Sequence, residues 1–321
     1  MPKLIHTISS IRTWQKCKKK WFWQNIELLK PAKPSKALEL GSAVHKFLEA
    51  VYSPLSKEES MRLMVQYCND HFSPEWLDVE TRRATAICDA YLETYGDKLI
   101  SNERGDVTSI EKRLTRDFRG FTFSGKTDMT TETHTVQKYI WDHKTTSDDI
   151  SNVGENYWQK MNLDNQAAVY SFLEGGSPRI VWDVIKKPGG NPKMKERIVK
   201  RKTESGEEFD QRKQDSMESL DEFQARLYQE IMNNKTGYFA RNEVYMTELH
   251  VAYAMEDLLS EALAIEEASR WPKSDGACIS GYGTFEYFGL CVGTESIDSG
   301  NFIKLKEAHP ELSESTESTV A

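Results

Sequence analysis

The most informative part of the sequence is FSGKTDMTTETHTVQKYIWDHKT, residues 123–145. It predicts the end of one β-strand and the whole of the next, joined by the polar turn Glu132–Thr135. Asp142 and Lys144 stand two positions apart on the second strand, and such side chains project from the same face of a sheet. Hairpin pairing of the two strands can bring Asp128 beside them. Two carboxylates and one ammonium group are therefore expected at one point of the sheet.

This grouping of charges has a chemical consequence. Two converging carboxylates repel each other unless a cation neutralises them, and hard oxygen ligands suit Mg²⁺. A lysine that does not bind the metal can then orient a water molecule or stabilise charge that develops on a phosphate. The alternative is an ordinary salt-bridged strand pair, which the Asp-x-Lys tripeptide taken alone favours.

The segments on either side of this stretch predict the rest of the fold. Ser9-Ser10 can cap a first helix that runs through Trp14, Cys17 and Trp21. Helices, a strand meander, a crossover helix and a further strand together predict an α/β core of mixed sheet with helices packed around it. Strands are expected over 108–118, 121–131, 136–145 and 179–185, an exposed hairpin or arm over 186–206, and further helices over about 35–51, 57–71, 78–98, 157–174, 207–233 and 247–270.

Composition narrows the class of protein. The chain has 321 residues, a net charge of −8 and 38% apolar residues. No apolar run approaches the roughly 18 residues that a membrane span needs. Five sparse cysteines argue against a disulfide-stapled secreted fold. A reducing, cytoplasmic location is therefore expected, without a membrane partner.

The acidic average hides two basic stretches. Residues 3–36 hold nine Lys or Arg and one acid, Glu27, and residues 186–202 hold eight against Glu196 alone. Basic stretches on an acidic body suit a polyanion bound at one place, and a solvated surface is an equal alternative on charge alone. Four aromatic residues can stack on the bases of a single strand, with burial in the core as the favoured alternative: Trp21, Trp23, Tyr157 and Trp158.

Five short motifs follow one another along the chain, and their order and spacing carry more weight than any one of them. Together they resemble the PD-(D/E)XK nuclease superfamily, and within it the RecB-like exonuclease branch of CRISPR-associated and phage-encoded nucleases. The resemblance runs from about residue 7 to 175, with looser echoes to about 291. The motifs are the Ser9-Ser10…Cys17 opening, Gly41-Ser-Ala-Val-His45, Gly125-Lys-Thr-Asp128, Asp142-His-Lys144 and Gln166-x-x-x-Tyr170.

The resemblance implies a restriction-endonuclease-like core of mixed β-sheet flanked by helices. A single nuclease domain is expected over residues 1–306. Residues 307–321, which are acidic and rich in Ser and Thr, are expected to be disordered. The parts of the domain would be an N-terminal helical part (1–100), the core (101–186), a basic arm (186–206) and C-terminal helices (207–275).

The resemblance also implies roles for individual residues. His45, Asp128 and Asp142 correspond to ligands of Mg²⁺ or Mn²⁺, with the backbone carbonyl of His143 as a further oxygen ligand. Lys144 corresponds to the catalytic lysine. Gln166 and Tyr170 correspond to a helix-borne motif that holds the DNA strand, and Glu111 falls near an additional acidic position.

Several relatives in this branch join their terminal regions through a [4Fe–4S] cluster held by one early and three late cysteines. Cys17, Cys278 and Cys291 match three of these positions, and Thr284 and Phe285 stand where the fourth would be. Because such a cluster takes four thiolates, we expect a degenerate site held by packing, without a cluster.

The function expected from these observations is divalent-metal-dependent hydrolysis of DNA by an exonuclease, in recombination, repair or phage DNA processing. DNA is the expected partner, in the cytoplasm of a bacterial or phage-infected cell. Two alternatives stay open: a non-catalytic DNA-binding or complex-forming subunit with a vestigial nuclease site, and a structure-specific endonuclease on the same fold. The joint presence of Asp128, Asp142 and Lys144 argues against the first, since inactive members commonly lose one of them.

Overall fold

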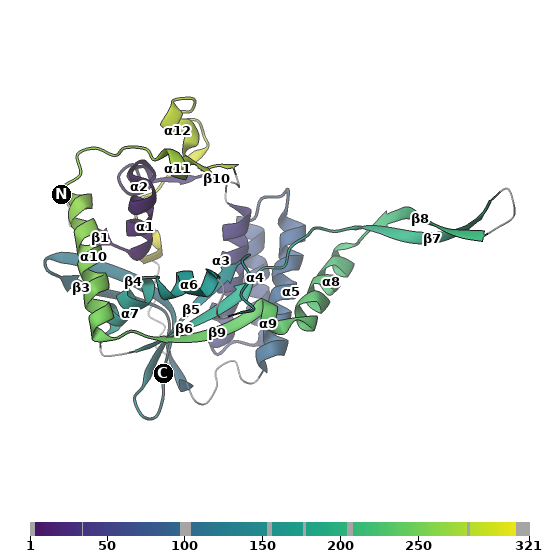
Figure 1. Ribbon diagram of the computed structural model, residues 1–321, viewed down its shortest axis with the longest axis horizontal. Helices are drawn as coiled ribbons and strands as arrows, with labels where there is room; N and C mark the ends of the chain where they lie inside the picture. The colour runs from purple at the N-terminus through teal and green to yellow at the C-terminus, as the bar shows by residue number, and fades with distance from the viewer. Residues whose placement is uncertain are drawn as a thin grey trace.

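The structure is a computed structural model that describes residues 4–33, 35–96, 104–152, 156–175, 178–203, 208–280 and 283–312. Its body is a mixed β-sheet with helices on both faces, and a two-stranded arm projects from it (Figure 1). The expected α/β class is therefore confirmed. Among these residues, none of the helices combines the length and the apolar character of a transmembrane span.

The central sheet has the strand order β1-β4-β5-β6-β9, and β3 also pairs with β4. Because β3 pairs along the whole of β4, strands β1 and β5 share the opposite edge of β4. β5 and β6 are parallel, and two helices form the crossover between them. The strands are β1 (Ile5–His6), β3 (Asp106–Phe118), β4 (Phe121–Glu132), β5 (Lys138–Thr146), β6 (Arg179–Lys186) and β9 (Phe239–Tyr245).

Each face of the sheet has its own helical layer. On one face, α3, α4, α5 and α8 enclose a core that includes Trp141 and Val181. On the other, α6 and α7 pack on Ile140 and Trp182, and α1, α2 and α10 pack beside α7. The helices are α1 (Ile8–Lys16), α2 (Lys18–Asn25), α3 (Lys36–Tyr52), α4 (Lys57–His71), α5 (Leu77–Tyr95), α6 (Asn156–Asn162), α7 (Gln166–Glu174), α8 (Leu220–Asn233), α9 (Lys235–Tyr238) and α10 (Glu248–Glu266).

A fork between β4 and β5 positions the site. The two strands pair from Glu132↔Lys138 to Met129↔Trp141 and no further. On the same edge of β4, pairing resumes only at Phe123, with β1. Asp128 therefore lies just beyond the point where β4 and β5 stop pairing. The two strands separate there, which makes room for side chains between them.

Two glycines of the sequence motifs allow helices to approach this fork closely. A Cβ atom on Gly125 would lie 3.2 Å from Leu173 Cδ1, so a small residue lets α7 pack against β4. A Cβ atom on Gly41 would lie only 2.7 Å from Thr145 Oγ1, next to Lys144. Both glycines therefore serve packing around the candidate site.

Two predicted helices are each divided in two. The backbone of Cys17 is extended (φ −158°), which separates α1 from α2, and Thr7 caps α1 in place of Ser9-Ser10 by accepting from the Ser10 N–H at 3.1 Å. The helix predicted over 157–174 breaks between α6 and α7, where the Asp164 carboxylate accepts the Gln166 N–H at 2.7 Å. Side chains that bond to nearby backbone groups compete with helix continuation.

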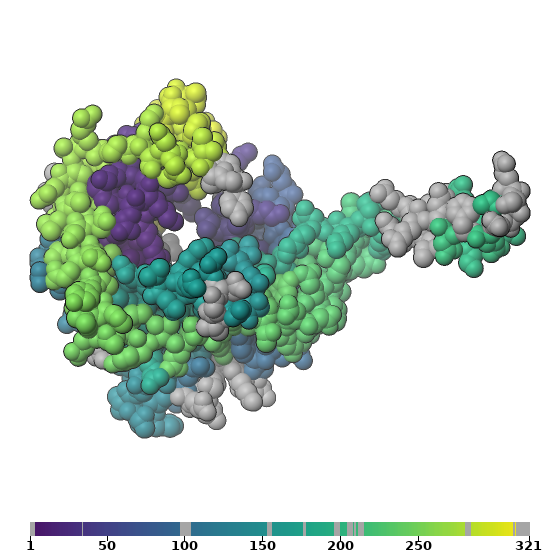
Figure 2. Space-filling model, in the orientation of Figure 1, coloured from purple at the N-terminus to yellow at the C-terminus, as the bar shows by residue number. Residues whose placement is uncertain are grey.

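The arm is longer than the predicted 186–206. β7 (Met194–Lys202) and β8 (Glu208–Met217) form an antiparallel ribbon that extends well beyond the body (Figure 2). The helix predicted over 207–233 is wrong before Leu220, because the first part of that segment pairs with β7. α8 begins behind a capping box formed by Ser219 and Glu222.

The C-terminal segment packs over the N-terminal helices (Figure 1). Its strand β12 (Phe302–Lys304) pairs with β2 (Leu29–Pro31), and the Tyr287 hydroxyl donates to the Leu29 carbonyl at 2.7 Å. Within the tail predicted to be disordered, Pro310–Leu312 form a 3₁₀ turn and Leu312 is buried. Residues 313–321 lie outside the described residues. The short elements before β12 are α11 (Asp275–Cys278), β10 (Ile279–Ser280), β11 (Gly283–Thr284) and α12 (Phe288–Val292).

Candidate active site

Asp142 and Lys144 lie side by side on β5, as their spacing predicts. Lys144 Nζ is 2.6 Å from Asp142 Oδ2 and donates a hydrogen bond to Gln166 Oε1 at 3.0 Å. Asp142 is buried, whereas 28% of the Lys144 side chain is exposed. The ammonium group therefore connects a buried carboxylate with the solvent.

Helix α7 supplies the other partners of Asp142. Gln166 Nε2 and the Tyr170 hydroxyl each donate to Asp142 Oδ1, both at 2.8 Å. Residues four apart lie on one face of a helix, so both reach the same carboxylate oxygen. Both side chains are buried and direct their polar atoms at Asp142 and Lys144 rather than at the protein surface.

Asp128 and His45 form a second pair at the fork, from β4 and α3. His45 Nδ1 lies 3.7 Å from Asp128 Oδ1, and the backbone N–H of His143 donates to Asp128 Oδ2 at 2.6 Å. Burial raises the pKa of Asp128, but the neighbouring imidazoles of His45 and His143 outweigh it, and the net pKa lies well below the usual range. Burial lowers the pKa of His45, and the Asp128 carboxylate more than reverses this.

The two carboxylates act on each other electrostatically. Burial, together with the charge of Asp128, raises the pKa of Asp142, and the Lys144 ammonium offsets only part of the rise. Carboxylates that disfavour each other's charge in this way are stabilised by a cation between them.

The donor set fits a hard divalent cation in its chemistry. Asp128, Asp142 and His45 offer carboxylate oxygens and an imidazole, which Mg²⁺ and Mn²⁺ accept. Asp142 Oδ2 is buried and forms an ion pair with the Lys144 ammonium. The described chain holds no group of three His, Cys, Asp or Glu side chains already placed to bind a metal. Asp142 accepts hydrogen bonds from Gln166 and Tyr170 of α7, and Asp128 lies against His45 of α3.

Glu111 lies beside this site, on β3. It forms an ion pair with Lys126 and lines a narrow crevice with His45, Glu49 and Asp128. Burial and the charge of Asp128 raise its pKa. Its backbone has a φ of +53°, in the left-handed region that non-glycine residues rarely adopt. The structure thus brings Glu111 to the Asp128 side of the site.

His143 points to the opposite face of β5 from Asp142 and Lys144. Its Nδ1 lies 3.0 Å from Asp183 Oδ2, and its ring stacks on Tyr52 at a centroid distance of 5.5 Å. Sequence reasoning missed Asp183, although an acidic residue inside the apolar strand RIVWDVIK was a signal for a buried polar role.

A cavity of about 480 Å³ lies near the start of α3, between α2, β2 and the C-terminal segment. Lys20, Lys30 and Lys33 from the N-terminal basic stretch line it, and Lys20 is paired with Glu286. Three of the four aromatic residues considered for base stacking are buried in the core, so that role is wrong for them: Trp21, Tyr157 and Trp158.

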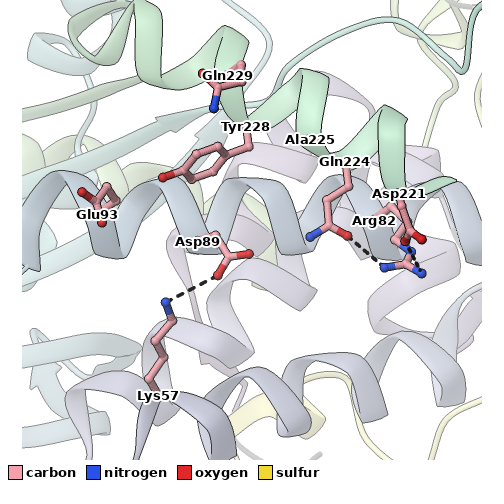
Figure 3. A pocket seen from close by; sticks show the side chains of 9 residues that line it. All are labelled: Lys57, Arg82, Asp89, Glu93, Asp221, Gln224, Ala225, Tyr228 and Gln229. Atoms are coloured by element: carbon pink, nitrogen blue, oxygen red, sulfur yellow. Dashed lines mark hydrogen bonds and ion pairs between the residues drawn. The ribbon is translucent and has the colours of Figure 1, made fainter. Parts of the chain in front are cut away.

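A second groove, between α5 and α8, is lined by charges that already pair with each other. Lys57 meets Asp89 at 3.6 Å, and Arg82 meets Asp221 at 3.0 Å (Figure 3). None of the predicted site residues lines this groove. It is therefore a structural feature of the helical layer.

Cys278 lies near both Cys17 and Cys291, the three cysteines that the family resemblance groups together. Burial and the neighbouring thiols of Cys17 and Cys291 raise the pKa of Cys278. Thr284, at the position of the fourth ligand, ends the short strand β11. Three thiols are one fewer than a [4Fe–4S] cluster takes.

Comparison with known proteins adds an independent finding. A family model described as the PD-(D/E)XK nuclease superfamily matches residues 6–244. No curated protein matches the sequence. A solved structure of a candidate exonuclease from Eubacterium rectale is 12% identical, over 90% of this chain and 88% of that one, with a TM-score of 0.48. The solved structure of SSO0001 is 12% identical, over 69% and 74%, with a TM-score of 0.27.

Proposed function

The chain belongs to the PD-(D/E)XK nuclease superfamily, and on that premise we propose that it is a divalent-metal-dependent DNA exonuclease. The family implies hydrolysis of phosphodiester bonds. Dependence on Mg²⁺ or Mn²⁺, and attack from DNA ends, go beyond what the family implies and are part of the proposal. The resemblance of the sequence to the RecB-like branch supports a role in recombination, repair or phage DNA processing.

One observation carries the proposal. On β5, Lys144 Nζ lies 2.6 Å from Asp142 Oδ2. Asp128 lies at the fork beside them, and its negative charge raises the pKa of Asp142. A structural salt bridge to Lys144 needs only the Asp142 carboxylate. A second carboxylate, that of Asp128, makes the ionised form of Asp142 less favourable. A second, half-buried carboxylate next to a partly exposed lysine supports a site for chemistry rather than for stability.

Each residue then has a defined task. His45, Asp128 and Asp142 would hold the cation, which supplies an activated water and neutralises charge on the phosphate when bound. Lys144 is partly exposed and can donate a hydrogen bond to a phosphate oxygen or hold the attacking water. Gln166 and Tyr170 fix the orientation of the Asp142 carboxylate by their two hydrogen bonds.

Basic side chains near the start of α3 suit the DNA backbone. Lys30 and Lys33 line the cavity beside α3, the helix that carries His45. Contacts to phosphates position DNA without reading its sequence, and they weaken as salt rises. We therefore propose sequence-independent, salt-sensitive binding.

The test uses the purified full chain with three DNA forms: linear duplex, closed circular duplex and linear single strand. Each is incubated with Mg²⁺, with Mn²⁺ or with EDTA. The proposal expects degradation of linear DNA with metal, none with EDTA, and intact circles. Cleavage of closed circles would instead identify an endonuclease, and metal-dependent binding without cleavage would identify a vestigial site.

A further inference from the structure

A buried ionic cluster lies directly behind the active-site strand. In the sheet register, His143 of β5 is level with Asp183 of β6, and Asp183 is level with Arg241 of β9. Residues level with each other on adjacent strands project from the same face. Three neighbouring strands thus place an imidazole, a carboxylate and a guanidinium in one row, on the face opposite to Asp142 and Lys144.

Asp183 is fully buried and fully partnered. Its Oδ1 accepts from Arg241 Nε at 3.1 Å, and its Oδ2 accepts from the Tyr91 hydroxyl and from His143 Nδ1 at 3.0 Å. The Tyr52 and Tyr91 hydroxyls, 2.7 Å apart, both accept from Arg241 Nη2. An ionised carboxylate only accepts hydrogen bonds, so the shared proton sits on Nδ1 of His143.

The fold itself gives no reason for this cluster. It lies beneath α3 and α5, against a large cluster of buried apolar side chains. Burying charges is costly, and well-packed apolar residues of similar volume often serve stability equally well. The one member of the row that borders the active site is His143.

His143 links the cluster to the active site through its backbone. Asp183 and the stacked ring of Tyr52 hold its imidazole, with an interplanar angle of 13° to Tyr52. Its N–H in turn donates to Asp128 Oδ2 at 2.6 Å. A shift of the imidazole would move this N–H, and with it the carboxylate that the N–H orients.

We propose that Asp183 is a positioning residue: by holding the His143 imidazole it fixes the backbone N–H that orients Asp128, and so sets the metal affinity of the site. This inference rests on the proposed function. Partners that orient a metal ligand without touching the metal change metal affinity by about 10- to 100-fold when they are lost.

Binding of Mn²⁺ alone, measured by isothermal titration calorimetry without DNA, tests the inference. Asp183→Asn keeps the shape of the side chain and removes its charge, and we expect Mn²⁺ binding weaker by about 10- to 100-fold. His143→Phe keeps the aromatic ring against Tyr52 and removes the bond to Asp183, and should weaken binding to a similar extent. Binding as tight as that of the wild type in either folded variant would overturn the inference.

A double-mutant cycle tests whether Asp183 acts through His143. If it does, Asp183→Asn adds little to the loss already caused by His143→Phe, because the two changes break one link. Fully additive losses would show that Asp183 acts by another route and would contradict the proposal. If Asp183→Asn does not fold, His143→Phe alone decides, since its folded form must bind Mn²⁺ more weakly.

Tyr95→Leu is the matched control. The Tyr95 ring packs on the Arg241 guanidinium at 3.6 Å and has no hydrogen bond to Asp183 or His143. For Tyr95→Leu we expect a lower unfolding temperature and unchanged Mn²⁺ binding. Weaker Mn²⁺ binding by this variant would mean that a general loss of packing in the core explains the effects of all the variants, and it would contradict the inference. If the wild-type chain binds no Mn²⁺ and cleaves no DNA, the proposed function fails. If it binds and cleaves, and Asp183→Asn binds equally well, only this inference fails.

Discussion

Gln166 on α7 and Asp142 on β5 are joined by a hydrogen bond of 2.8 Å, from Gln166 Nε2 to Asp142 Oδ1. The same amide accepts a hydrogen bond from Lys144 Nζ through its Oε1 atom. One side chain therefore holds both the buried carboxylate and the ammonium group in place. This explains why a glutamine at this point of the crossover helix belongs to the site without reaching the solvent.

Replacing Gln166 should impair the chemical step. Gln166→Ala frees Asp142 and Lys144 from their shared partner, and we expect kcat to fall by about 10- to 100-fold, as is typical when a group that orients a ligand is lost. Gln166→Glu places a third carboxylate next to Asp142 and should be more harmful. Steady-state cleavage of linear DNA measures both variants, and equal kcat values for Gln166→Ala and the wild type would contradict the assignment.

Adding a methyl group at Gly41 should disturb the site through Thr145, the residue after Lys144. In Gly41→Ala the Cβ atom would lie 2.7 Å from Thr145 Oγ1 before any adjustment. Overpacking of this kind costs about 1–3 kcal/mol, and the displaced Thr145 adjoins Lys144. We expect a lower free energy of unfolding in urea and weaker cleavage, whereas Gly189→Ala is the control that should change neither, since nothing lies within 4 Å of its Cβ position.

The stability of the buried cluster should depend on pH. Burial raises the pKa of Asp183, but Arg241, His143 and Tyr91 outweigh it and hold the pKa well below its usual value. A group whose pKa is lower in the folded state stabilises that state above its unfolded pKa, about 4 for Asp, and this contribution is lost as the pH falls below it. Asp183→Asn should thus cost about 3–5 kcal/mol near neutral pH.

The difference between Asp183→Asn and the wild type should shrink as the pH drops below about 4. Unfolding in urea at a series of pH values measures it. A destabilisation that stays constant from neutral pH into the acid range would mean that the charge of Asp183 contributes nothing.

The cysteines should differ in reactivity. Burial raises the pKa of Cys68 to about 11 and raises that of Cys88 as well, so neither carries much of the reactive thiolate near neutral pH. Cys291 is partly exposed. Brief alkylation of the native chain at about pH 8, followed by peptide mass spectrometry, should label Cys291 and spare Cys68 and Cys88. Equal labelling of Cys68 and Cys291 would contradict the packing of α4.

Much of the core could be predicted from the sequence, because its signals are local. The alternation around Asp142 and Lys144 fixes a shared face, and the helical patterns of α3, α4 and α5 hold within a few residues. The division at Cys17 and the break before Gln166 depend on single side chains and backbone angles, which periodicity does not register. Helical propensity likewise fails over β8, whose structure comes from pairing with β7.

The candidate site was only partly predictable for a related reason. Spacing brings Asp142 and Lys144 together, but the row of His143, Asp183 and Arg241 exists only in the register of three strands far apart in the chain. The inward direction of Gln166 and Tyr170 similarly depends on how α7 lies across β4. Long-range register and helix placement follow from the assembled core and have no local signature.

Asp128, Asp142 and Lys144 form one catalytic site in the proposed function, and cleavage of end-labelled linear duplex DNA measures whether each of them is needed. The wild type with Mg²⁺ should release label from the ends, and Asp128→Asn and Lys144→Ala should each reduce the rate by at least about 100-fold while remaining folded. Lys112→Ala, which removes an exposed lysine of β3 paired with Glu174, should cleave at the wild-type rate. Undiminished cleavage by folded Asp128→Asn or Lys144→Ala would show that these residues do not form the catalytic site.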